Sequence, residues 1–363
     1  MISLCMIVKN EEDTLARCLA SAKDIADEII IVDTGSTDRT KEVARAFTDH
    51  IFDFVWIDDF SAARNYSFSL ATQEYILWLD ADDVIEEKDR KLFLELKQTL
   101  DPSVNSVRMN YNLVVDDHGN VVWSLARDRL VRRACHFQWI GAVHEYLAVS
   151  GNVKVSEIAI THKRSKPHTD RNLQIYRRRH EAGEPFTPRD LYYFANELRD
   201  HAFYQEAVDF YEQFLRTKLG WVEDNIAACI KIADCFAHLG NRDKQYQALL
   251  QTLVYDKPRA EFCCQLGELF MEEQQWEKAI FWYALAASLG APPDSGMLVN
   301  HAAWTWLPHL QLCVCYDRLG DYDKARYHND LALSHNPTHP SMLYNKEYFD
   351  KKFSDTSGDG RVP

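Results

Sequence analysis

The spacing of hydrophobic and polar residues changes along the chain between residues 165 and 190. Before this stretch, short apolar runs alternate with segments whose apolar residues recur at helical spacing. We expect strands over residues 2–8, 28–33, 52–57 and 75–80, and helices over residues 12–23, 37–47 and 61–71. This alternation predicts right-handed βαβ units around a mainly parallel sheet. Further strands are expected over residues 106–115 and 121–123.

From residue 191 onward the pattern is helical, and a short motif recurs within it. The motif occupies residues 203–207, 275–279 and 321–325, with a more divergent copy at 241–245. Gln245 and Ala279 lie 34 residues apart, which is the period of tetratricopeptide repeats. A plain helical bundle is the alternative, and the spacing favours repeats. Such solenoids bind peptides or partner proteins on a concave face.

These patterns divide the chain into four segments. We expect an α/β domain over residues 1–165, a linker or lid over 166–190, a helical repeat domain over 191–345, and a C-terminal tail over 346–363 that ends in disorder. The basic stretch 163–168 stands out where the first segment ends. It suits either a mobile lid that closes over phosphate groups or a solvated linker.

Three carboxylates directly follow the apolar run 75–79, at Asp80, Asp82 and Asp83. Acidic residues at the carboxyl end of such a strand stand where open α/β sheets bind ligands. Carboxylates gathered at one point repel one another unless a cation neutralises them, and oxygen ligands suit Mg²⁺ or Mn²⁺. A strand-end turn is the alternative interpretation, because Asp is a common turn residue.

Other polar residues end the neighbouring strands. Val8 and Asn10 close the first expected strand, and Asp33 closes the second, where a carboxylate can accept hydrogen bonds from a base or a ribose. Gly35 allows a tight turn directly after Asp33. Arg64 opens an expected helix near the same sheet edge, where an arginine can pair with a carboxylate or a diphosphate.

Composition limits the classes of partner. The net charge of −14 argues against a nucleic-acid-binding surface or an anionic-membrane patch. No apolar run approaches the roughly 20 residues of an integral membrane segment, and no signal-peptide pattern precedes the first strand. The nine cysteines show no zinc-type spacing and suit buried free thiols. A cytoplasmic, reducing setting is therefore expected.

Taken in order, the motifs at residues 9–12, 33–38, 63–65 and 80–82 resemble those of the family-2 glycosyltransferases, whose nucleotide-diphosphate-sugar-binding fold is called GT-A. The resemblance covers residues 2 to 165. It implies a nucleotide-sugar donor, such as a UDP-sugar, in a cradle that includes Val8 and Asn10. It also implies that Asp33 contacts the uracil or ribose, that Arg64 lies by the base and diphosphate, and that Asp80 faces the ribose.

The same resemblance implies a metal and a base. Asp82 would be the principal ligand of Mg²⁺ or Mn²⁺, which neutralises charge on the departing nucleoside diphosphate. Related enzymes often bring a late histidine to the metal, and His162 stands at such a place, with a structural role as its alternative. The family usually places its base on a loop as an Asp after a Glu. Here the loop carries His144 and Glu145, of which we favour Glu145, and packing of both is the alternative.

The whole chain resembles bacterial enzymes that join such a domain to tetratricopeptide-like repeats and glycosylate peptides or proteins. This group includes enzymes that attach glucose to cysteine thiols of bacteriocin precursors. The resemblance implies an inverting, metal-dependent hexosyl transfer from UDP-glucose or a similar donor to a peptide or protein side chain held by the repeats. The repeats can equally form a homodimer. Two alternatives stay open, namely a transferase acting on lipopolysaccharide core or another envelope glycan, and an inactive domain in a repeat-based scaffold.

Overall fold

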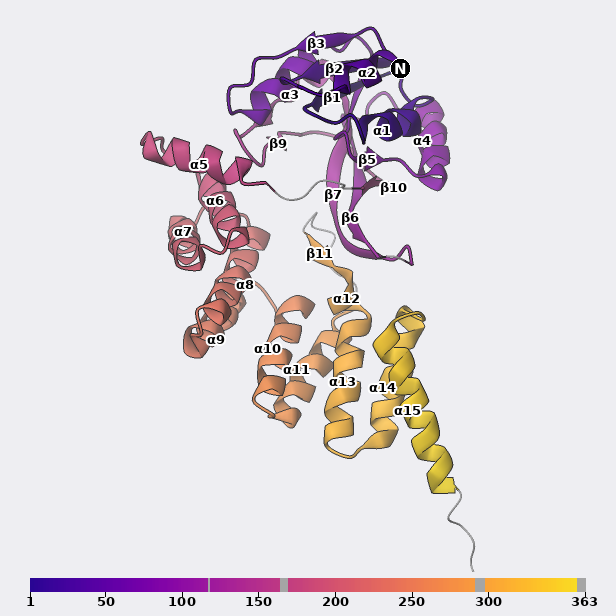
Figure 1. The fold of residues 1–363 in the computed structure, drawn as a ribbon, viewed down its shortest axis with the longest axis vertical. Helices are drawn as coiled ribbons and strands as arrows, with labels where there is room; N and C mark the ends of the chain where they lie inside the picture. Colours follow the sequence, from indigo (N-terminus) through magenta and orange to yellow (C-terminus); the bar gives the residue numbers. More distant parts are fainter. Residues whose placement is uncertain (117, 164–168, 291–297, 358–363) are drawn as a thin grey trace, which may run out of the picture. The chain divides into compact units, whose positions relative to one another are not determined.

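The computed structural model describes residues 1–116, 118–163, 169–290 and 298–357, which form two compact units (Figure 1). The first unit holds residues 1–115 and 123–201, and the second holds nearly all of the chain after residue 201. The boundary between the two units follows His201, about ten residues after the boundary near residue 190 that the sequence predicts. Most of the predicted basic lid, at 164–168, and the predicted disordered end of the tail, at 358–363, lie outside the described residues.

A mixed sheet forms the centre of the first unit, with strand order β3-β2-β1-β4-β7-β6-β10-β5. Its parallel half consists of β1 (Ile2–Val8), β2 (Glu28–Asp33), β3 (Ile51–Asp53) and β4 (Tyr75–Trp78). The other half consists of β5 (Asp83–Val84), β6 (Ser106–Val115), β7 (Val121–Arg132) and β10 (Val153–His162). β7 runs antiparallel to β4, and β5 runs antiparallel to β10. A separate pair is formed by β8 (Trp139–Ile140) and β9 (Tyr146–Leu147).

Helices cover both faces of this sheet, because side chains along each strand alternate between the faces. On β1, Leu4 and Met6 join the larger apolar core, whereas Cys5 joins a smaller core on the opposite face. The larger core is closed by α1 (Leu15–Ala22) and α4 (Glu87–Thr99), and the smaller core by α3 (Phe60–Ser69). The short helix α2 (Thr40–Arg45) follows β2. The predicted strands over 2–8 and 28–33 are confirmed, and the strand predicted over 75–80 ends at Trp78.

Two further helices end the first unit, α5 (Arg171–Glu181) and α6 (Pro188–Asp200). A capping box begins α6: the Thr187 hydroxyl accepts from the Asp190 N–H, and the Asp190 carboxylate accepts from the Thr187 N–H. Pro188 follows at the first helical position, where its missing N–H is not needed. The segment predicted as a linker or lid therefore contains a helix.

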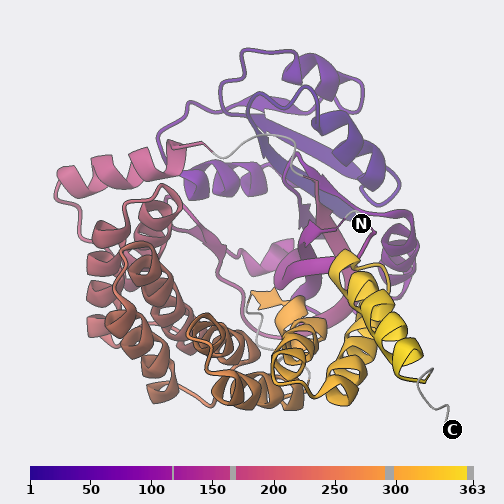
Figure 2. The same cartoon turned by 60° about the horizontal axis from the view of Figure 1, so that its bottom comes forward.

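The second unit is helical (Figures 1 and 2). Its elements are α7 (Tyr204–Thr217), α8 (Val222–His238), α9 (Arg242–Gln251), α10 (Ala260–Glu272), α11 (Trp276–Ser288), β11 (Val299–Asn300), α12 (His301–Trp304), α13 (Trp306–Arg318), α14 (Tyr322–His335) and α15 (Pro340–Ser357). The helix α15 occupies much of the predicted tail. Within the described ranges, no helix is both long and apolar enough to cross a lipid bilayer.

The recurring sequence motif marks one structural place in this unit, the beginning of a helix that follows a tight turn. It begins α7, α9, α11 and α14, and the turn before each has a residue at positive φ, at Ala202, Gly240, Gln274 and Gly320. Close packing within a pair depends on Gly267 of α10, where an added Cβ would lie 2.7 Å from the Tyr283 ring of α11. The helical period and its turns therefore agree with the predicted repeats.

Candidate active site

The carboxyl ends of β1, β2 and β4 meet at one edge of the sheet, because these strands are parallel. Asp33 ends β2 with 1% of its surface exposed, and its Oδ1 accepts hydrogen bonds from the N–H groups of Gly35 and Ser36, each at 2.9 Å. Its Oδ2 is buried and has no hydrogen-bond partner among the described residues. Because a buried acceptor without a partner costs about 1–3 kcal/mol, this oxygen suits a donor group on a ligand.

Val8 and Asn10 lie beside this turn and hold its shape. The Val8 carbonyl accepts from the N–H and the hydroxyl of Thr34, at 2.9 and 3.1 Å. Asn10, at φ 56°, donates its N–H to the Ser36 hydroxyl at 2.8 Å and accepts the Thr37 N–H at 2.7 Å. The residues at the end of β1 therefore stabilise the turn that follows β2.

Arg64, on α3, joins two carboxylates that are far apart in the sequence. Its Nη2 donates to Asp80 at 2.7 Å, and its Nε donates to Glu145 at 2.5 Å. The guanidinium carbon lies 5.0 Å from the Trp78 ring centre and 4.8 Å from the Trp139 ring centre. These aromatic rings shield the cation from water and strengthen its attraction to the two carboxylates.

The neighbouring charges keep the side chains of Asp80 and Arg64 ionised. Burial raises the pKa of Asp80, but the neighbouring Arg64 and Arg129 outweigh burial and leave the pKa below its usual value. Burial likewise lowers the pKa of Arg64, but Asp80 and Glu145 more than reverse this effect. Asp80 is therefore an ionised carboxylate, directed by a permanent cation.

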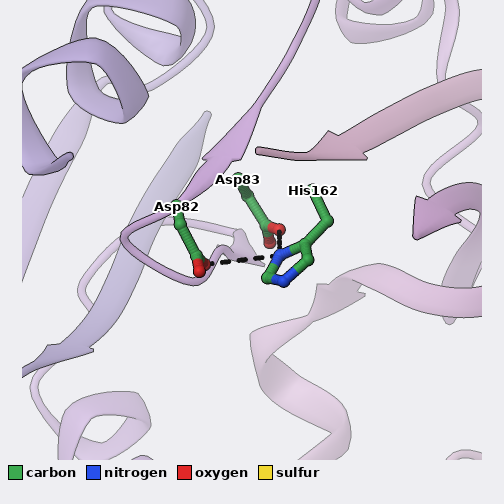
Figure 3. Close-up of side chains that lie close together, drawn as sticks. All are labelled: Asp82, Asp83 and His162. Carbon is green, nitrogen blue, oxygen red and sulfur yellow. Dashed lines mark ion pairs between the residues drawn. The ribbon is translucent and has the colours of Figure 1, made fainter. Parts of the chain in front are cut away.

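A second cluster lies where β5 pairs with β10, and Figure 3 shows its side chains directed at one ring nitrogen. Nδ1 of His162 lies 3.4 Å from Asp82 and 3.5 Å from Asp83. Burial and the adjacent carboxylates raise the pKa of Asp82. Burial lowers the pKa of His162, but Asp83 and Asp82 raise it above its usual value. A cluster that attracts protons in this way also attracts a divalent cation.

Two members of this cluster fit a metal better than the third. The carboxylate of Asp83 is fully buried and already accepts from Tyr111 Oη at 2.9 Å and from the Asp80 N–H at 3.0 Å, and it pairs with Arg129 at 3.0 Å. Asp82 and His162 are 25% and 21% exposed and can hold a cation between them. A carboxylate with an imidazole suits Mn²⁺, and carboxylate oxygens also suit Mg²⁺.

Sequence reasoning missed two residues that position this cluster, Tyr111 and Arg129. Tyr111 Oη lies within hydrogen-bond distance of both Asp83 and His162, at 2.9 and 3.0 Å. Arg129 lies between the rings of Trp78 and Tyr111, at 3.8 and 4.3 Å from their centres. Arg129 lies in β7, beyond the strand predicted over residues 121–123, so the sequence pattern did not indicate that this charge is buried and requires a partner.

The predicted base loop lies between β8 and β9 and carries both candidates. Glu145 is held by Arg64, as described above, which brings this loop to the Asp80 carboxylate. Nε2 of His144 lies 2.7 Å from Glu197 of α6, a residue that sequence reasoning did not select. The structure therefore brings Arg64, Asp80 and Glu145 together in one group, and it joins His144 to a different carboxylate.

The chain is similar in sequence to known glycosyltransferases and to a repeat protein. Residues 3–136 match the family described as glycosyl transferase family 2. The SPbeta prophage-derived glycosyltransferase SunS of Bacillus subtilis is 28% identical over 223 residues, which cover 58% of this chain and 52% of SunS. A TPR repeat-containing protein of Synechococcus elongatus is 49% identical over 100 residues, covering 28% of this chain and 24% of that protein. The crystal structure of S. aureus TarS 1–349 overlaps 68% of this chain and 89% of that chain, with 13% identity and a TM-score of 0.36.

The fold and the family match define the class of the N-terminal domain, which is a glycosyltransferase domain of family 2. The chain joins this domain to a tetratricopeptide-like helical domain, so the predicted fold class is confirmed. The chain spans 24% of the Synechococcus relative and 52% of SunS.

Proposed function

We propose that this protein transfers a hexosyl group from a UDP-sugar to a peptide or protein side chain, with inversion at the anomeric carbon and with Mn²⁺ or Mg²⁺. The observation that carries the proposal is the gathering of Asp33, Arg64, Asp80 and Asp82 at one edge of a family-2 domain. Each of these side chains has the chemistry that one part of a nucleotide sugar requires.

On this proposal, each part of the donor contacts a different residue along this edge of the sheet. The unpartnered Oδ2 of Asp33 accepts a hydrogen bond from the uracil or ribose. Asp80, kept ionised beside Arg64, accepts from the ribose hydroxyls. Asp82 and His162 hold the cation, which supplies positive charge to the departing diphosphate when bound.

The acceptor side of the proposal rests on the helical repeats and on the loop between β8 and β9. Repeat solenoids hold extended peptides, so we assign the binding of the acceptor peptide to the repeats. A cysteine thiol is the acceptor that we test first, because a thiol loses its proton more readily than a hydroxyl. The base belongs to the loop that carries His144 and Glu145.

The proposal is tested by incubating the protein with Mn²⁺, a panel of UDP-, GDP- and dTDP-sugars, and acceptors that include peptides with one Cys, Ser or Thr and a lipopolysaccharide-core glycan. We expect UDP release from a UDP-sugar, and mass spectrometry should show one added hexose on the Cys peptide. EDTA and the Asp82→Asn substitution should each abolish both signals. Absence of nucleotide release from every donor would overturn the proposal, whereas release with hexose on a glycan acceptor only would redirect it to envelope glycans.

A further inference from the structure

His144 of the predicted base loop pairs with a buried glutamate of α6, Glu197. Nε2 of His144 donates to Glu197 Oε1 at 2.7 Å, and only 3% of the Glu197 side chain is exposed. The His144 ring stacks on the Tyr193 ring with 4.4 Å between the ring centres and 17° between the planes. Both Glu197 and Tyr193 come from α6, so a helix beyond the family-matched residues orients this imidazole.

The backbone of the loop is held as firmly as the ring. Arg189 donates from Nε and Nη2 to the His144 carbonyl, at 3.1 and 2.9 Å. Tyr176 donates its hydroxyl to the Val143 carbonyl at 3.3 Å. His144 itself has φ 51°, a left-handed conformation that costs a non-glycine residue about 1–3 kcal/mol and persists where surrounding contacts impose it. The helices α5 and α6 supply these contacts.

The pairing leaves the two candidate bases in different situations. Glu145 is 11% exposed and Arg64 binds its Oε1, so this carboxylate already serves a structural ion pair. His144 is 31% exposed, and no described residue hydrogen bonds its Nδ1. A carboxylate that accepts the N–H of one ring nitrogen leaves a lone pair on the other. Glu197 therefore presents His144 as a proton acceptor.

We propose that Glu197 is a positioning residue that orients His144 to take the proton of the acceptor. This inference rests on the proposed function. The acceptor oxygen or sulfur forms a bond to the anomeric carbon, the bond from that carbon to the diphosphate oxygen breaks, and its electron pair leaves with UDP. The acceptor proton moves to Nδ1, while Nε2–H stays bound to Glu197, which stabilises the imidazolium.

The first test compares Glu197→Gln with the matched control Glu184→Gln. Glu184 pairs with Arg179 of α5 and is half exposed, and within the described residues it forms no hydrogen bond or ion pair with His144 or Glu145. With UDP-glucose, Mn²⁺ and water or a Cys peptide as acceptor, Glu197→Gln should lower kcat by about 10²-fold, within the range of proton-transfer catalysis. Its KM for UDP-glucose and its Kd for UDP should stay unchanged, and the control should match the wild type. These binding constants also establish that the variant is folded.

The second test asks whether Glu197 acts through His144. In a double-mutant cycle, Glu197→Gln should add no loss of kcat to His144→Gln. Nitrogen-15 NMR of labelled histidines should show the Nε2–H tautomer of His144 in the wild type and a mixture of tautomers in Glu197→Gln, with His144→Gln used for assignment. An additive cycle, an unchanged tautomer or an unchanged kcat would each overturn this inference. UDP release by the wild type would still uphold the proposed function in each of these cases. Absence of UDP release from the wild type would overturn both.

Discussion

Arg129 and Asp83 form an ion pair with 3.0 Å between Nη1 and Oδ2, and neither side chain is exposed to solvent. This pair explains why three neighbouring carboxylates can coexist at the end of β4. Asp83 is neutralised from inside the protein, and Asp82 stays accessible for a cation. The tertiary structure therefore divides the acidic cluster into a structural carboxylate and a carboxylate for a metal.

The buried pair predicts a large effect on stability. Arg129→Met should lower the free energy of unfolding of the first unit by about 3–5 kcal/mol, because Asp83 would be left as an uncompensated buried charge. Urea unfolding followed by tryptophan fluorescence measures this effect. Arg108→Met is the control, since Arg108 is 38% exposed in its pair with Asp128 and its loss should cost at most about 1 kcal/mol. Equal losses in the two variants would contradict the prediction.

The two neighbouring carboxylates should respond differently to the same substitution. Asp82→Asn should weaken Mn²⁺ binding by at least about 10²-fold, because it removes a proposed metal ligand. The melting temperature should change little, because burial and the neighbouring carboxylates already disfavour the ionised form of Asp82. Asp83→Asn should instead lower the melting temperature, since it leaves Arg129 buried without a counter-charge. Calorimetric titration with Mn²⁺ and thermal unfolding separate the effects. A strong loss of Mn²⁺ affinity in a fully stable Asp83→Asn variant would reverse the assignment.

Arg64 should not be replaceable by lysine. An ammonium group cannot donate to Asp80 and Glu145 in the planar geometry of Arg64, although it keeps the charge. We expect Arg64→Lys to lower kcat/KM for UDP release by about 10²-fold, the size of effect that a small misplacement of reacting groups produces. Arg39→Lys is a suitable control, because Arg39 lies in an exposed pair with Glu12. Near-normal kinetics in Arg64→Lys would show that the charge alone is sufficient.

The helical unit should lose stability in mild acid. His328 of α14 lies 3.1 Å from His309 of α13, nitrogen to nitrogen, and burial, followed by the His309 charge, lowers the pKa of His328 to about 4. An unfolded histidine titrates near pH 6.5, so between pH 6.5 and 4 the unfolded state binds more protons and stability falls with falling pH.

Thermal unfolding at pH 7 and pH 5 tests this linkage. The melting temperature of the wild type should fall by about 2–4 °C more than that of His328→Gln, which cannot take up the proton. Equal decreases in the wild type and the variant would show that other groups control the acid sensitivity.

The sequence predicted those parts of the fold that depend on short-range patterns. The strands over 2–8 and 28–33 follow from continuous apolar runs, and the repeats follow from a motif that recurs at the beginning of a helix. Asp33 ends β2 and Asp80 follows β4, and the parallel strands bring both residues to one edge of the sheet. These inferences depend only on residues that are close in sequence and on the parallel order of the strands, which the sequence pattern predicts.

The remaining features depended on packing between distant segments. Arg64 and Glu145 are 81 residues apart, and His144 and Glu197 are 53 residues apart, so no local period reports either contact. The pattern around residues 171–181 is strongly charged, and its helix is stabilised by burying Leu173, Ile175 and Tyr176 within the first unit. The sequence by itself determined which chemical groups the protein has and the strand ends that carry them. Only the tertiary structure decided which charge neutralises which, because burial and distance set the strength of every such pair.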